Sequence, residues 1–173
     1  INAFEPGDLR KSSWINSTVF PAGGNTYLYP YKYKVGVHNR IIGAAPSVET
    51  KEYYMALRLA EQYLIRAEAA AISGQSDLAV DDLNVIRKRA GLEDLPKTLT
   101  RDALLAAVAK ERQTELFVEW GHRWMDLKRT GKASTVLSAI PLKQPWQGDY
   151  QLLYPIPIDE IRKDHFLKQN PNY

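Results

Sequence analysis

Cysteine is absent from the 173 residues, which excludes a disulfide framework, a thiolate metal site and a cysteine nucleophile. The sequence also lacks an apolar run approaching the roughly 20 residues that a transmembrane helix needs. An excess of one charge is missing too, because 23 Lys and Arg face 20 Asp and Glu, for a formal net charge of +3. The basic residues are scattered among acids, so the composition argues against nucleic-acid binding.

Apolar residues make up 45% of the chain, enough for a hydrophobic core. The length suits one domain or one lobe of a larger protein, and we expect residues 1–173 to form a single lobe. Within it, residues 1–51 are rich in Gly, Pro, Asn, Ser and Tyr and have little helical period. Residues 52–131 are helical in pattern, and residues 132–173 are predicted to form proline-rich loops with a C-terminal strap.

Residues 52–91 have the pattern of an antiparallel helical hairpin. In its first half, apolar side chains recur every three or four residues, at Leu57, Ala60, Leu64, Ala67 and Ala71, and Gly74 provides a stop. In its second half, Ser76 is a candidate N-cap, a further apolar stripe follows, and Gly91 is a candidate C-terminal glycine. The length and the small residues are similar to a tetratricopeptide unit of about 34 residues.

A third helix is predicted from a cap at Thr100 and continues in pattern toward Gly131. At about 100° per residue, Arg112, Glu115 and Glu119 share the face of the apolar core positions. Lys110, Gln113 and Thr114 fall on the opposite side of this helix, whereas Trp120 and Trp124 are predicted to lie in the core. Since a lone buried charge costs several kcal/mol, burial requires partners. Arg112 can pair with Glu115 or Glu119, and the i,i+4 spacing also links Glu119 to Arg123 and His122 to Asp126.

Three interpretations compete for this cluster. A glycosidase carboxylate pair requires one acid with a raised pKa, whereas neighbouring arginines keep acids ionised. A metal site is hinted at by Glu119-x-x-His122, but a di-iron centre needs a second such motif and further glutamates. A structural ion network of Arg112, Glu115, Glu119, Arg123 and Asp126 is the favoured interpretation, with no metal and no catalytic residue.

Several segments of the sequence belong together: RLAEQYLIRAEA (58–69), DLNVIRKRAGL (82–92), ERQTELFVEWGHRWMDLKRTG (111–131), LYPIPIDEI (153–161) and QNPNY (169–173), with YPYKYKVG (29–36) upstream. Taken together, these segments resemble the SusD/RagB family of surface glycan-binding lipoproteins from Bacteroidetes. Their order and their place at the chain end make the resemblance specific. It implies a mainly α fold, with the tetratricopeptide-like hairpin, further helices and long irregular loops of a SusD-like C-terminal lobe.

The resemblance also implies a function and its partners. Proteins of this family hold oligosaccharides or other nutrients at the outer-membrane surface, beside a SusC-like TonB-dependent transporter, and they are not enzymes. No cofactor is implied. The chain is expected to correspond to the C-terminal portion of such a protein, whose N-terminal lobe carries most repeats and the lipid-bearing cysteine.

Aromatic side chains are the candidates for ligand contact, because Tyr and Trp offer a flat apolar face and a polar tip to a sugar ring. In an extended segment, Tyr27 and Tyr29 would point to one side, although Pro30 argues against a central strand. The candidate ligand-binding residues are Trp14, Asn16, Tyr27, Tyr29, Trp146 and Tyr150. For each ring, packing against the rest of the lobe is the alternative.

Two alternative functions stay open on the sequence. The first is a protein–protein interaction scaffold built on a helical repeat and without a ligand site of its own. The second is a glycoside hydrolase. For the C-terminal segment, a strap laid across the helical face is favoured over a tail recognised by a partner.

Overall fold

The computed structural model describes residues 2–19, 23–34, 52, 53 and 55–173. It forms two compact units, Ile1–His122 and Arg123–Tyr173, and the prediction of a single lobe stays a prediction. Residues 35–51 of the predicted irregular segment lie outside the described part of the chain. Helices dominate the rest, so the predicted mainly α class is confirmed.

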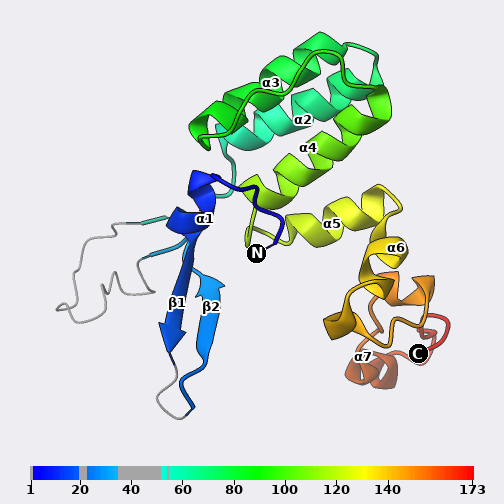
Figure 1. The fold of residues 1–173 in the computed structure, drawn as a ribbon. Helices are drawn as coiled ribbons and strands as arrows, with labels where there is room; N and C mark the ends of the chain where they lie inside the picture. Colours follow the sequence, from blue (N-terminus) through cyan, green and yellow to red (C-terminus); the bar gives the residue numbers. More distant parts are fainter. Residues whose placement is uncertain (1, 20–22, 35–51, 54) are drawn as a thin grey trace. The chain divides into compact units, whose positions relative to one another are not determined.

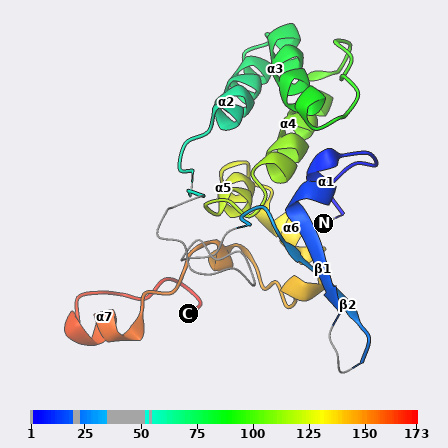
Figure 2. The ribbon, with the colours of Figure 1, turned by 90° about the vertical axis from the view of Figure 1, so that its left-hand side faces the viewer.

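The first unit contains a short helix, a two-stranded ribbon and three longer helices. They are α1 (Leu9–Trp14), β1 (Ile15–Val19), β2 (Thr26–Pro30), α2 (Leu59–Ile72), α3 (Ser76–Arg89) and α4 (Arg101–Glu115). Helices α2, α3 and α4 lie side by side (Figure 1). The antiparallel ribbon extends from the end of α1 (Figure 2), and Pro30 is the last residue of its second strand.

The core of this unit lies between the three longer helices and consists of small and aliphatic side chains. Leu64, Leu83 and Leu104, one from each helix, are fully buried. Helix α3 ends at Arg89, and the predicted C-terminal glycine, Gly91, follows the cap residue with a φ of 74°. There the Leu92 N–H bonds to the Arg87 carbonyl and the Gly91 N–H to the Lys88 carbonyl, which is a Schellman motif. A side chain at Gly91 would also collide with Leu9 of α1, only 2.8 Å from the position of a Cβ.

Three local predictions about the helices were wrong. The hairpin's first helix begins at Leu59 rather than near residue 52, and Leu57 is 77% exposed instead of packed. Arg58 is in extended conformation because its guanidinium is bound by two carboxylates, that of Glu115 at the end of α4 and that of Glu119 beyond it. The third helix does begin at a Thr100 cap, but it ends at Glu115 instead of continuing to Gly131.

The turn after α4 explains a further correction. Val118 and Trp120 both have positive φ, 56° and 40°, so the backbone leaves the helical conformation and forms a turn here. Trp120 is therefore 62% exposed rather than part of the core, and its indole N–H donates to the Met55 carbonyl. Thr114, predicted to lie opposite the core face, is buried.

The second unit has shorter elements and a smaller core. After α5 (His122–Arg129), which crosses the boundary between the units, come α6 (Ala133–Ser138), η1 (Pro141–Lys143), η2 (Asp149–Leu152) and α7 (Ile158–Lys163). The buried residues Leu127, Ala133 and Leu137 form the core, and Trp124 and Trp146 pack against it. Neither unit contains, in its described residues, a helix long and apolar enough to cross a membrane.

The C-terminal strap lies against the extended segment 153–156. The Gln169 amide accepts from the Ile156 N–H and donates to the Ile156 carbonyl, at 2.8 and 2.9 Å. Asn170 donates to the Tyr154 carbonyl, and the Tyr173 hydroxyl donates to the Leu153 carbonyl. The strap is therefore held by hydrogen bonds to the backbone of its own unit, together with the edge-to-face contact between Tyr173 and Tyr150.

Candidate functional site

One face of the ribbon combines exposed aromatic and amide groups. In the antiparallel register, Asn16 is opposite Tyr29 and Thr18 is opposite Tyr27. Directly opposite residues, and residues two apart on a strand, share a face, so these four side chains line one surface. Tyr27 is 54% exposed, Asn16 and Thr18 are exposed, and Tyr29 is half-buried. We call this surface, formed by Asn16, Thr18, Tyr27 and Tyr29, the ribbon face.

Aromatic and cationic groups close the base of the ribbon. The Tyr31 N–H donates to the Trp14 carbonyl at 2.7 Å, directly beyond the paired strands. The Tyr31 ring meets the Tyr29 ring edge-to-face, with 6.2 Å between the ring centroids. The Lys32 ammonium lies 3.8 Å from the centre of the Trp14 ring, so one face of this predicted ligand-binding tryptophan is already occupied by a cation.

The other predicted ligand residues, Trp146 and Tyr150, belong to the second unit. Trp146 is half-buried against the small core, and its indole N–H donates to the Ser134 hydroxyl at 3.0 Å. Tyr150 packs edge-to-face on Tyr173, at 5.3 Å between centroids, and its hydroxyl bonds to the Gln147 amide oxygen. The six candidates therefore divide into four on or beside the ribbon and two in the second unit.

Three buried carboxylates, Glu111 and Glu115 of α4 and Glu119 just beyond it, organise the helical side of the first unit. The Arg10 guanidinium reaches Glu111 and Glu115 at 2.5 and 3.2 Å. Arg58 binds Glu115 and Glu119 at 2.8 and 2.9 Å. Lys32, Arg87 and Arg89 make further ion pairs with the same three acids. We call these eight groups, together with Asp8 and Glu5, which bind Arg10 and Arg87, the carboxylate network.

Burial and ion pairing oppose each other in this network. Burial raises the pKa of Glu115, but hydrogen bonds from Arg89 and Arg58 outweigh it, so that the pKa lies below its ordinary value. For Glu111 burial wins, and the pKa is raised despite the Arg10 charge. Both side chains are less than 5% exposed. A general acid must reach its substrate, and neither carboxyl is accessible from solvent in this arrangement.

Of the remaining predicted network members, Arg112 lies in α4, whereas Arg123 and Asp126 lie in α5 and belong to the second unit. Arg112 is buried in α4, and its predicted pairing with Glu115 or Glu119 stays a prediction. Asp126 accepts from Arg129, at 2.8 Å and i,i+3 spacing. Burial lowers the pKa of Arg123, with Asp126 opposing the shift.

The side chains of the Glu119-x-x-His122 motif, considered above as half of a metal site, contact other protein groups. Both oxygens of Glu119 are bound, one by Lys32 and the other by Arg58, and His122 lies 3.6 Å from Glu61. In the part of the chain that the structure describes, no group of three or more His, Cys, Asp or Glu is placed to hold a metal ion.

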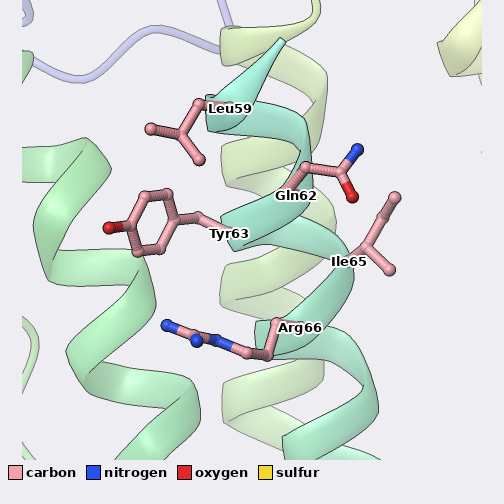
Figure 3. A pocket seen from close by; sticks show the side chains of 5 residues that line it. All are labelled: Leu59, Gln62, Tyr63, Ile65 and Arg66. Carbon is pink, nitrogen blue, oxygen red and sulfur yellow. The ribbon is translucent and has the colours of Figure 1, made fainter. Parts of the chain in front are cut away.

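A hollow lies on α2. Leu59, Gln62, Tyr63, Ile65 and Arg66 line about 360 Å³ of it, which is within the size range of ligand pockets. In Figure 3 the Tyr63 ring lies between Leu59 and Arg66. The Arg66 guanidinium is already bound to Asp82 at 2.6 and 2.7 Å. The same guanidinium lies over the Tyr63 ring, 5.5 Å from its centre, so a cation already covers one face of this tyrosine.

Sequence reasoning missed several members of the carboxylate network. Glu111 was detectable, because at about 100° per residue it falls on the same face as Leu104 and Val108. Arg10, Lys32 and Arg58 come from segments 57 to 105 residues away from their acids. Such pairs follow from the tertiary fold and leave no periodic signal in the sequence.

Comparison with known proteins identifies the family. Residues 11–173 match the family model described as the SusD family. The chain is 34% identical over 125 residues to the starch-binding protein SusD of Bacteroides thetaiotaomicron, covering 67% of this chain and 21% of that protein. It is 32% identical over 140 residues to the SusD-like protein P38 of Formosa agariphila, covering 76% and 27%. The matches thus span only about a fifth to a quarter of these relatives.

The fold agrees with these matches. A SusD superfamily protein from Bacteroides vulgatus superposes with a TM-score of 0.73 at 22% identity, covering 96% of this chain and 40% of that one. Because the identity is low, this superposition supports the fold alone. The family match covers nearly the whole sequence, and we conclude that this chain belongs to the SusD family.

Proposed function

We propose that this chain is part of a cell-surface glycan-binding protein, which captures oligosaccharide for a SusC-type TonB-dependent transporter. Membership of the SusD family and the name of the starch-binding relative support carbohydrate as the ligand class. Placement at the outer membrane by a lipid anchor, and binding without turnover, belong to the same proposal.

The ribbon face is the observation that carries the proposal. A pyranose has an apolar face of C–H groups and a rim of hydroxyls. Tyr27 and Tyr29 supply flat rings with polar tips, and Asn16 supplies an amide that can both donate and accept. These three groups share one face of the two-stranded ribbon, and Tyr27 is 54% exposed there. Trp146 and Tyr150, in the second unit, are proposed as ligand contacts separately from the ribbon face.

The experiment is calorimetric titration of the full-length protein with maltoheptaose, xylohexaose, a mixed-linkage β-glucan oligosaccharide and an alginate oligosaccharide. One of these should bind without release of reducing ends. Tyr27→Ala and Tyr29→Ala should each weaken that binding about tenfold, equivalent to about 1.4 kcal/mol. Tyr53→Ala, which removes another tyrosine, 68% exposed, is the matched control. Reducing-sugar release would replace the binding role by glycoside hydrolysis.

A second candidate, the interaction scaffold, is favoured by the exposed apolar side chains along α2. Leu59, Ile65 and Ile72 are 72%, 48% and 55% exposed there, and large exposed apolar patches are typical of protein interfaces. The titration separates the two functions. If all four oligosaccharides fail to bind a folded protein while a transporter of the SusC type is retained on an affinity column, the scaffold function holds instead.

A further inference from the structure

Lys32 joins the ribbon to the helices of the first unit. It lies two residues beyond the end of β2, and Trp14 directly precedes β1. Its ammonium is 2.6 Å from the Glu119 carboxylate and 2.6 Å from the Glu115 carbonyl. The Trp14 ring covers it at 3.8 Å. The ammonium is thereby enclosed by two acceptors and one aromatic face, and the side chain is only 9% exposed.

The groups that face this ammonium are themselves fixed. Arg58 binds the second oxygen of Glu119 and donates to the Glu115 carbonyl that also accepts from Lys32. The Glu115 carboxylate is bound by Arg10, Arg58 and Arg89. Glu119 follows α4 in a turn with positive φ on either side, at Val118 and Trp120. Lys32 therefore binds a prearranged pair of oxygen atoms.

Stability alone is a weak reason for this arrangement. Burial lowers the pKa of Lys32, and the hydrogen bond to Glu119 offsets this only in part. Buried ion pairs often contribute no more than an apolar replacement of similar size, and their best-attested role is to fix register. The ribbon needs such fixing, because an isolated two-stranded hairpin is marginally stable in water.

We propose that Lys32 is a positioning residue for ligand binding, holding the ribbon face in place through Glu119 and the Glu115 carbonyl. This inference rests on the proposed function of the ribbon face in glycan capture. Lys32 itself points to the helices, so it acts through Tyr29 and Tyr27 and not by contact with the ligand. The ligand would then meet rings whose position is set before it arrives, which reduces the entropy lost on binding.

The test compares Lys32→Met with Lys32→Arg in the full-length protein. Lys32→Met keeps the length and apolar body of the side chain but removes its charge. Amide hydrogen exchange at residues 15–19 and 26–29 should accelerate at least tenfold, while exchange within α2 and α3 stays unchanged. Affinity for the oligosaccharide that the wild type binds should fall about tenfold, and Lys32→Arg should recover part of both effects.

A matched control and a substitute variant keep the outcome decisive. Arg66→Met breaks an ion pair between α2 and α3, remote from the ribbon in sequence, and should change neither affinity nor ribbon exchange. If Lys32→Met fails to fold, Lys32→Gln, which retains one donor, takes its place. Unchanged ribbon exchange in a folded variant overturns the inference. If the wild type binds no oligosaccharide, the proposed function fails, and the exchange data still decide whether Lys32 holds the ribbon.

Discussion

The two units of this chain satisfy their polar groups by different means. In the first unit, buried carboxylates are paired with arginine and lysine side chains. The fully buried Glu115, for example, accepts from three arginines. In the second, the polar contacts that hold the strap are neutral, since Gln169 and Asn170 bind backbone groups of the segment 153–156. The ion network of the first unit depends on every partner being present, whereas each hydrogen bond of the strap contributes to stability separately.

The two units also differ in the size of their hydrophobic cores. Leu64, Leu83 and Leu104 belong to a large buried cluster between three helices. The second unit buries Leu127, Ala133 and Leu137 and completes its core with half-buried tryptophans. Removal of one buried charge partner costs several kcal/mol, whereas a neutral hydrogen bond contributes about 1. The comparison therefore predicts that single substitutions are far more damaging in the first unit.

Glu115→Ala should have the largest effect. It leaves Arg10, Arg58 and Arg89 without a shared partner inside the protein, and we expect the free energy of unfolding to fall by about 3–5 kcal/mol. Urea denaturation of the full-length protein, followed by far-UV circular dichroism, measures it. Glu115→Gln, which keeps the shape but not the charge, should be less damaging.

An exposed carboxylate of the second unit provides the matched comparison. Glu160 pairs with Lys163 at 2.8 Å in α7, and both side chains are at least half exposed. Glu160→Ala should cost less than about 0.5 kcal/mol, because surface pairs of this kind are weak. Equal losses for the two alanine variants would contradict the division between the units.

Sequence patterns predicted the parts of the first unit that have a regular period. The stripe through Ala60, Leu64 and Ala67 packs as expected, and the Thr100 cap and Gly91 lie at the helix ends where they were predicted. Burial of Glu115 and Glu119 followed from the same helical reasoning. Glu119 is buried as predicted, but it does not lie on the predicted continuous helix, because α4 ends at Glu115.

The failures have a common physical reason. Gly121 follows Trp120, but no glycine or proline lies between Glu115 and Trp120, so residue type does not predict the positive φ of Val118 and Trp120 or the exposed indole. Tertiary ion pairs from Arg58 and Lys32 hold Glu119 inside this turn. The candidate ligand residues depend equally on tertiary structure, because strand register alone places Asn16 opposite Tyr29.

Gln169→Ala should have an intermediate effect, confined to the second unit. It removes both bonds to Ile156, which are only partly buried, so we expect a loss of about 1–2 kcal/mol. Faster amide exchange at Ile156 and at Tyr173, with exchange in α2 unchanged, would locate the effect. The exposed neighbour Lys168 provides the control, since Lys168→Ala should alter neither site. Acceleration across α2 as well would mean that the strap also supports the helices.

The last prediction concerns pH and an edge of the carboxylate network. The hydrogen bond from Arg87 lowers the pKa of Glu5 to about 2, from an ordinary value of 4.5. Since the folded state holds this proton less tightly than the unfolded state, the stabilisation is complete above pH 4.5 and disappears as the pH falls through 2. Glu5 is 28% exposed, so solvent screening limits it to on the order of 1 kcal/mol. Urea midpoints of wild type and Glu5→Gln, measured from pH 6 to pH 2, should differ at neutral pH and converge on acidification. A constant difference across this range would assign the stabilisation to packing of the side chain instead of its charge.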